Sequence, residues 1–305
     1  MKILYIAGYG RCGSTALDIL LGNHPDIVGV GELVHIFGDW LDRDRLCSCG
    51  APYQDCAFWK DLFAGCPPVS RDLQVLRDFG SVWNVPRILS ERITATALQT
   101  YRKYQSHVIK YVLARSGKSL VVDSSKSSWA VAGRFQALRR LADQDVYVLH
   151  LVRHGLSVIE SRALTGSNLV LQGQTHSLRH PVARTACGWL VTNLWTSLLG
   201  RALGSRRYLL IRYEDFIVDP VATLRTIGGF CGFNAECLVK RIENDDSFRI
   251  GHLVRGNRIR WGHGMRLKRS LGRVPGKSLR WHQRLLFNCI GGWLLRCYGY
   301  QATKG

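Results

Sequence analysis

Short apolar runs that are rich in β-branched residues recur along the chain and predict the strands of a sheet. They cover residues 3–7, 119–122, 146–152 and 208–211, with a shorter run at 27–30. Each run ends in polar residues, and helical patterns fill most of the chain between them. Continuous apolar strands separated by helices are typical of a parallel sheet that is covered on both faces. We therefore predict an α/β fold, a three-layer sandwich with a central parallel sheet flanked by helices.

The longer segments between these runs predict helices. Residues 72–116 have the pattern of two helices with a break near Pro86, and residues 127–142 and 182–204 each predict one more. The apolar segment 285–300 is interrupted by Arg296, which favours a packed C-terminal helix. Internal repeats and linker-like composition are absent from the sequence, so we expect residues 1–305 to form one domain.

The polar residues that follow the strands are the candidates for chemistry, because ligands of such sheets bind beyond the carboxyl ends of the strands. Residues 8–15, Gly-Tyr-Gly-Arg-Cys-Gly-Ser-Thr, join the first strand to a helix. A glycine loop at a helix N-terminus directs backbone N–H groups at an anion. Its spacing is close to that of the triphosphate-binding P-loop, but Ser14 stands where that loop has lysine, and the nearby cation is Arg11. The loop predicts a phosphorylated nucleotide rather than a magnesium-dependent triphosphate.

Composition and charge narrow the class of protein and its partners. Hydrophobic residues make up 46% of the chain and charged residues 21%, which indicates a globular protein. The net charge of +20 indicates an anionic partner: a nucleotide, an acidic acceptor, nucleic acid or an anionic membrane surface. Met1 and Lys2 lead straight into a strand, and no apolar run reaches about 18 residues, so we expect neither a signal peptide nor a membrane span. We expect a cytoplasmic protein, with peripheral membrane contact left open by its charge.

Ten cysteines are present, and four of them cluster in a loop segment. These are Cys47, Cys49, Cys56 and Cys66. Three interpretations remain open: a zinc site, a loop tied by a disulfide, or reduced thiols around a turn. Zinc sites usually show C-x₂₋₄-C, which the C-x-C spacing fits poorly, so the sequence favours structural thiols or a disulfide. The other six cysteines lie in apolar segments, as small buried hydrophobic residues do.

The glycine loop and its surroundings resemble a known family. Residues 10–17, followed by Asn-His-Pro at 23–25 and Gly-Glu-Leu at 31–33, resemble sulfotransferases that use 3′-phosphoadenosine-5′-phosphosulfate (PAPS). The resemblance is to the bacterial branch and to carbohydrate and tyrosylprotein sulfotransferases. It implies a P-loop-like fold whose loop holds the 5′-phosphosulfate. The implied loop residues are Arg11, Cys12, Gly13, Ser14 and Thr15.

Four further motifs follow in the order typical of this family. Residues 151–161 resemble its 3′-phosphate site, residues 123–126 its strand-end loop with a lysine near the leaving group, and residues 212–216 its Tyr-Glu-Asp-Leu segment. Residues 256–260 resemble a Gly-Asn-Pro-x-Arg loop in which Arg258 replaces the proline. The residues thereby implied to bind the cofactor or leaving group are Arg153, Ser161, Lys126, Tyr213, Asn257 and Arg260.

The resemblance also implies a metal-free mechanism with an acceptor hydroxyl. Glu32 is the candidate general base, and Arg11 and Lys126 would stabilise the departing phosphate. The structural alternatives are a helix cap or ion-pair partner for Glu32, a solvated loop lysine for Lys126 and an ordinary strand-end charge for Arg153. The implied acceptor is a carbohydrate, a glycolipid or another small molecule.

Variable segments, about 35–110 and 163–180, are expected to form the acceptor site, the second as a mobile loop. A loop at about 252–277 is expected to cover the cofactor.

Two rival functions remain. A nucleotide or small-molecule kinase shares the fold but needs the P-loop lysine that is missing here. A non-enzymatic binder of nucleic acid or membranes fits the charge, although no nucleic-acid-binding motif is recognisable.

Overall fold

The structure is a computed structural model that describes residues 1–128, 130–165, 181–267 and 274–301. Its centre is a parallel sheet of five strands in the order β2-β3-β1-β4-β5. The strands are β1 (Lys2–Ala7), β2 (Ile27–Gly29), β3 (Leu120–Asp123), β4 (Asp145–Val152) and β5 (Tyr208–Arg212). Each coincides with one of the five predicted apolar runs, and the predicted α/β class is confirmed.

Strand β1 lies in the middle of the sheet, and Ile3 pairs with Val121 of β3 on one side and with Val146 of β4 on the other. The chain builds the β2-β3 side first and then crosses to the β4-β5 side. Such a change of direction opens a crevice beyond the carboxyl ends of the central strands. The loop after β1, the central strand, therefore lies at this crevice.

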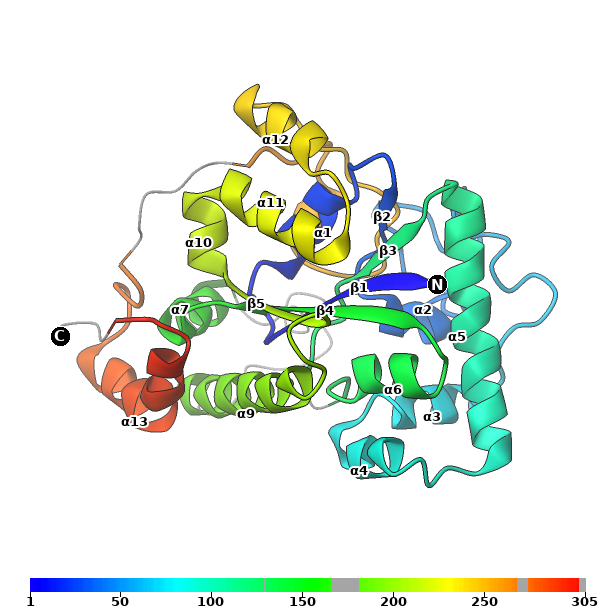
Figure 1. The fold of residues 1–305 in the computed structure, drawn as a ribbon, viewed down its shortest axis with the longest axis horizontal. Helices are drawn as coiled ribbons and strands as arrows, with labels where there is room; N and C mark the ends of the chain where they lie inside the picture. The colour runs from blue at the N-terminus through cyan, green and yellow to red at the C-terminus, as the bar shows by residue number, and fades with distance from the viewer. Residues whose placement is uncertain (129, 166–180, 268–273, 302–305) are drawn as a thin grey trace.

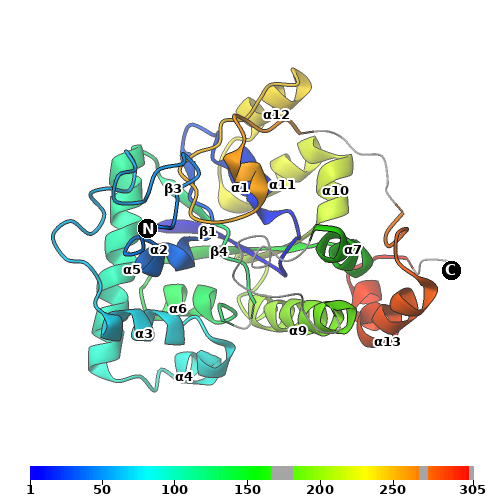
Figure 2. The same ribbon diagram turned by 180° about the vertical axis from the view of Figure 1, so that it is seen from behind.

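Helices cover both faces of the sheet, as Figure 1 shows from one side and Figure 2 from the other. One face carries α1 (Ser14–Leu21), α10 (Tyr213–Val218), α11 (Pro220–Cys231) and α12 (Glu236–Glu243), and the other carries α6 (Arg134–Arg140) and α9 (Pro181–Arg201). Alternate β1 side chains serve the two layers: Leu4 and Ile6 pack with α1 and α11, whereas Ile3 and Tyr5 pack with α6. Burial on both faces explains why the strands are continuously apolar.

Between β2 and β3 the chain forms more helices than the sequence predicts. They are α2 (Ile36–Asp39), α3 (Ser70–Asp78), α4 (Val85–Leu89) and α5 (Ala95–Ser116), with the 3₁₀ turns η1 (Leu33–His35) and η2 (Val82–Asn84). The expected break near Pro86 is found, since α3 ends at Asp78 and α4 begins at Val85. Pro86 lies in the first turn of α4, where the N–H that proline lacks is not needed. The long helix α5 ends at Gly117, which adopts the left-handed conformation.

The C-terminal half completes the layer beside β4. Helix α7 (Gly155–Thr165) follows β4, the 3₁₀ turn η3 (Arg258–Trp261) follows later, and α13 (Trp281–Cys297) packs against α9. Phe287 of α13 meets Trp189 of α9 edge to face, so the expected packed C-terminal helix is confirmed. Most of segment 163–180 and part of segment 252–277 lie outside the described residues. Within the described ranges, no helix has the length and apolar character that crossing a membrane would require.

Candidate functional site

The loop from Gly8 to Gly13 turns sharply between β1 and α1. Gly8, Arg11 and Gly13 all have positive φ, at 134°, 72° and 98°. A Cβ atom at Gly13 would lie 2.4 Å from two ring carbons of Tyr213, so both the backbone conformation and the space require glycine there. The loop thus brings the N-terminus of α1 against the start of α10, at the carboxyl edge of the sheet.

A cavity of about 210 Å³ opens at this edge. Its walls come from the ends of four strands and from one distant loop, the segment around residue 257. The lining residues are Arg11, Gly13, Ser14, Thr15, Ala16, Lys126, Arg153, Ser161, Tyr213, Asn257 and Ile259. Eight of the residues predicted to bind the cofactor, together with Lys126, therefore lie around one cavity, although they are spread along most of the chain.

The two hydroxyl groups at the start of α1 lie at this cavity and differ in their hydrogen bonding. Ser14 Oγ is buried and has no hydrogen-bond partner among the described residues. Thr15 Oγ1 accepts a hydrogen bond from the backbone N–H of Asn257 at 3.1 Å. An unpartnered buried hydroxyl is costly, so the position of Ser14 suits an oxygen-rich ligand that would accept its hydrogen bond. Thr15 instead fixes the distant loop to the phosphate-binding turn.

Arg153, at the end of β4, is held between the glycine loop and an aromatic ring. Its Nη1 donates to the backbone oxygen of Arg11 at 3.0 Å, and its guanidinium lies 4.7 Å from the ring centroid of Tyr213. Trp189 fixes the backbone of Arg153 by donating to its carbonyl oxygen at 2.9 Å. The Nε atom is buried and has no partner among the described residues. Arg153 is therefore fixed in place and keeps an unused donor, which is what an anion-binding arginine needs.

Positive charge is concentrated around Arg11. Burial lowers the pKa of Arg11, and the nearby charges of Arg162, Arg258 and Arg153 lower it further. The sequence analysis missed Arg162 and Arg258. Arg162 follows Ser161 on α7, and its Nη1 donates to Tyr9 Oη at 2.8 Å. Cations clustered in this way repel one another, so a bound polyanion would relieve the repulsion.

Glu32 forms an ion pair with Lys126, whose side chain also lines the cavity. His35 approaches the second carboxylate oxygen, with its Nε2 3.6 Å from Oε2. Burial raises the pKa of Glu32, but the charge of Lys126 and the hydrogen bond of His35 outweigh burial and lower it to about 2. In this arrangement the carboxylate is ionised and neutralised by its partner, as the ion-pair alternative for Glu32 anticipates.

The backbone around Glu32 is fixed from three directions. Gly31 N–H donates to Asp18 Oδ2 of α1 at 3.0 Å, and Glu32 N–H donates to the carbonyl of Val254 at 2.6 Å. Ser124 N–H, after β3, donates to the carbonyl of Gly31 at 2.8 Å. The backbone that carries the carboxylate is therefore attached to α1, to the residue after β3 and to the segment that leads into the Asn257 loop.

Two of the expected cofactor residues turn away from the cavity. Cys12 is buried in the core beneath the loop, with 1% of its surface exposed, so only its backbone belongs to the turn. Arg260 donates to the carbonyl of Leu46 at 3.4 Å and packs over Trp261, and Ile259 lines the cavity in that region. The 3₁₀ turn η3 rotates Arg260 inward to the 46–53 loop, a reversal that sequence spacing does not encode.

Comparisons with known proteins identify the family of the chain and a similar fold. The sulfotransferase domain of the curacin biosynthetic pathway has a similar structure, with a TM-score of 0.57 and 17% identity over 98% of both chains. The sulfotransferase domain of the olefin synthase from Synechococcus PCC 7002 aligns with a TM-score of 0.47 and 20% identity, over 99% of this chain and 96% of that one. Among curated protein sequences, no relative matches. A sequence profile of the sulfotransferase family matches residues 4–236, and the chain therefore belongs to that family.

Proposed function

We propose that this protein is a PAPS-dependent sulfotransferase that transfers a sulfuryl group to the hydroxyl of a carbohydrate, a glycolipid or another small molecule. The observation that carries the proposal is the cavity at the carboxyl edge of the sheet, with Arg11, Lys126 and Arg153 in its wall. Its cations and helix N-terminus suit a nucleotide with several negative charges. The missing P-loop lysine argues against a magnesium-bound triphosphate.

The residues around the cavity fit the two phosphate-like ends of PAPS. The unpartnered hydroxyl of Ser14 and the N-terminus of α1 suit the 5′-phosphosulfate, close to Arg11. The unused Nε of Arg153, together with Ser161 in the wall, suits the 3′-phosphate. The Arg153 guanidinium packs over the ring of Tyr213. The same ring provides an aromatic surface for contact with the nucleotide. Asn257 completes the wall from the far end of the chain.

Bound PAPS supplies the sulfuryl group and a phosphate leaving group. The protein has to align the acceptor oxygen, remove its proton and stabilise the charge that develops on the leaving side. We assign the proton to Glu32 and the stabilisation of charge to Lys126 and Arg11. While Lys126 is paired with Glu32, the low pKa makes the carboxylate a weak base. When Lys126 turns toward an anion in the cavity, burial raises the pKa of Glu32 and strengthens it as a base.

Calorimetric titration with adenosine 3′,5′-bisphosphate in EDTA tests the binding part of the proposal. Arg153→Ala should weaken binding by at least tenfold, because it removes the fixed arginine of the 3′-phosphate site. Arg225→Ala is the matched control, since it removes the same charge from an exposed arginine of α11 and should leave binding unchanged. If folded wild-type protein does not bind adenosine 3′,5′-bisphosphate, or if ATP with magnesium stabilises it instead, the proposal is wrong. The nucleotide or small-molecule kinase is then the favoured function.

A turnover assay tests the assignment of the base. Glu32→Gln keeps the shape of the side chain but removes the proton acceptor, so turnover with PAPS and a panel of hydroxyl acceptors should fall at least a hundredfold. Affinity for adenosine 3′,5′-bisphosphate should stay within a few-fold of wild type. Retained turnover would contradict the assignment of Glu32 as the base and leave the nucleotide site unaffected. Lost nucleotide binding would show instead that Glu32 contributes to binding the nucleotide.

A further inference from the structure

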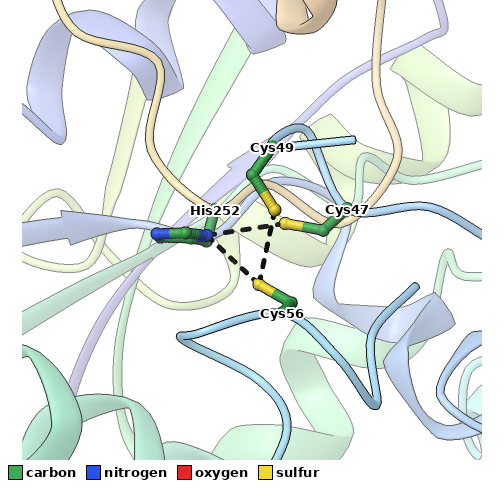
Figure 3. Close-up of side chains that lie close together, drawn as sticks. All are labelled: Cys47, Cys49, Cys56 and His252. Carbon is green, nitrogen blue, oxygen red and sulfur yellow. Dashed lines mark hydrogen bonds between the residues drawn. The ribbon is translucent and has the colours of Figure 1, made fainter. Parts of the chain in front are cut away.

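Three of the clustered cysteines converge with a histidine that is distant in the sequence. Figure 3 shows the side chains of Cys47, Cys49, Cys56 and His252 pointing toward one another. The three Sγ atoms and His252 Nδ1 all lie within 4.8 Å of one another. Cys66, the fourth cysteine of the segment, is not among them, and its Sγ accepts a hydrogen bond from Lys103 at 3.2 Å. The histidine replaces it in the set, which is why cysteine spacing alone did not reveal the cluster.

The separations are those of ligands around one small ion. Cys49 Sγ lies 3.6 Å from Cys56 Sγ, and His252 Nδ1 lies 3.7 Å from Cys47 Sγ and 3.2 Å from Cys56 Sγ. A tetrahedral zinc ion with ordinary bond lengths separates two sulfur ligands by about 3.8 Å, and a sulfur from a nitrogen by about 3.6 Å. A disulfide needs about 2.0 Å between sulfurs. All ten cysteines lie in the described part of the chain, and none is paired in a disulfide.

We propose that Cys47, Cys49, Cys56 and His252 form a structural zinc site. The three thiols would bind as thiolates and release their protons to solvent. Three sulfurs and one imidazole fill the four positions of tetrahedral zinc and leave none for a substrate, as in structural rather than catalytic sites. The C-x-C spacing made zinc the less favoured interpretation of the sequence, and the contribution of His252 reverses that preference.

The surroundings of the cluster hold its ligands in place. Cys47 and Cys56 are fully buried, and Phe58 stacks on the His252 ring at a centroid distance of 5.4 Å. Trp59 Nε1 donates to the backbone oxygen of His252 at 2.9 Å. The turn that contains Cys47 closes through Gly50 N–H, which donates to the Cys47 carbonyl at 2.9 Å. The ligand set is therefore preorganised by packing and backbone hydrogen bonds.

The proposed ion would join two segments that the sequence keeps far apart. The loop at 47–56 belongs to the expected acceptor region, and His252 stands just before the segment that leads to the cofactor cavity. Two residues after His252, the Val254 carbonyl accepts the N–H of Glu32 at 2.6 Å. Metal binding would thus fix the register of the segment that reaches Glu32 and Asn257. This role is independent of which donor or acceptor the protein uses.

The metal content of the full-length protein tests the proposal. After expression with added zinc and extensive dialysis, elemental analysis should find one zinc per chain. Cys56→Ser should reduce this to well below one, whereas Cys66→Ser, the matched control from the same segment, should keep it. Equal zinc in wild type and in folded Cys56→Ser would overturn the proposal.

Cobalt and a thiol titration make the test independent of how well the variant folds. Wild-type protein loaded with Co²⁺ should show thiolate-to-cobalt charge-transfer bands and the strong visible bands of tetrahedral cobalt. Denatured protein treated with EDTA, without reductant, should titrate as ten thiols, the full cysteine count. A wild-type protein that takes up neither metal under reducing conditions refutes the site. Loss of two thiols to a disulfide that involves Cys47, Cys49 or Cys56 refutes it as well.

Discussion

Replacing Lys126 with methionine removes one charge from the Glu32–Lys126 pair and nearly preserves the length of the side chain. The pair is well sheltered, since the side chains of Lys126 and Glu32 are 16% and 14% exposed. Burial alone would raise the pKa of Glu32, but Lys126 and His35 lower it from 4.5 to about 2. At about 1.4 kcal/mol per pKa unit, ionised Glu32 stabilises the folded state by about 3 kcal/mol at neutral pH.

The Lys126→Met variant should therefore lose about 3–5 kcal/mol in free energy of unfolding, because it leaves a buried carboxylate without its partner. Urea unfolding at pH 7.5 measures the loss. Lys60→Met, at an exposed lysine, is the control and should change stability by no more than about 0.5 kcal/mol. The double variant Glu32→Gln/Lys126→Met should recover most of the loss, with a coupling energy of about 3 kcal/mol.

The pH dependence provides a second, independent signature. Because the pKa of Glu32 is depressed in the folded protein, its stabilisation is fully present above pH 4.5 and is lost as the pH falls toward 2. In Lys126→Met the deficit should shrink on acidification to pH 5, because burial then raises the pKa of Glu32 and its protonation removes the uncompensated charge. Additive losses in the double variant, or a deficit that grows at pH 5, would refute this account of the pair.

Three further predictions concern the scaffold. Gly13→Ala should lower the melting temperature and weaken binding of adenosine 3′,5′-bisphosphate in calorimetry, because the added Cβ would lie 2.4 Å from the Tyr213 ring. Gly38→Ala is the control, since no atom lies within 4 Å of a Cβ added there. Arg134→Met should cost about 3–5 kcal/mol in urea unfolding, since it strands buried Asp123, and Asp123→Asn in the same chain should restore part of it. Removing the proposed zinc with a chelator should lower the melting temperature by several degrees in scanning calorimetry, and an unchanged value would contradict a structural role.

Local sequence signals were sufficient for the sheet and for the glycine loop. Each strand is apolar on both faces because helices cover both faces, and that property is readable from composition alone. The loop is readable because its glycines are required by positive φ and close approach, as at Gly13. Arg153 and Lys126 follow from the rule that ligands gather at the carboxyl ends of strands.

The remainder of the site depends on contacts that no local pattern records. Arg260 turns away from the cavity because η3 rotates it toward the carbonyl of Leu46. Arg258 contributes charge at a position where the resemblance expected proline. His252 joins the three cysteines from a segment roughly two hundred residues away, so only the tertiary structure reveals the fourth ligand. Helix propensity also left the role of Pro86 open, because proline both breaks helices and begins them.

The segment from His252 to Asn257 connects these observations. His252 lies at the cysteine cluster, the Val254 carbonyl accepts the N–H of Glu32, and Arg255 binds Asp39 through two hydrogen bonds of 2.6 Å. Asn257 then reaches Thr15 at the phosphate-binding turn. One short stretch of backbone therefore contacts both Glu32, the proposed base, and the wall of the cofactor cavity. A metal ion at His252 would therefore help to position Glu32 and Asn257, the two groups that the proposed transfer requires to be aligned. It would do so without contacting the nucleotide.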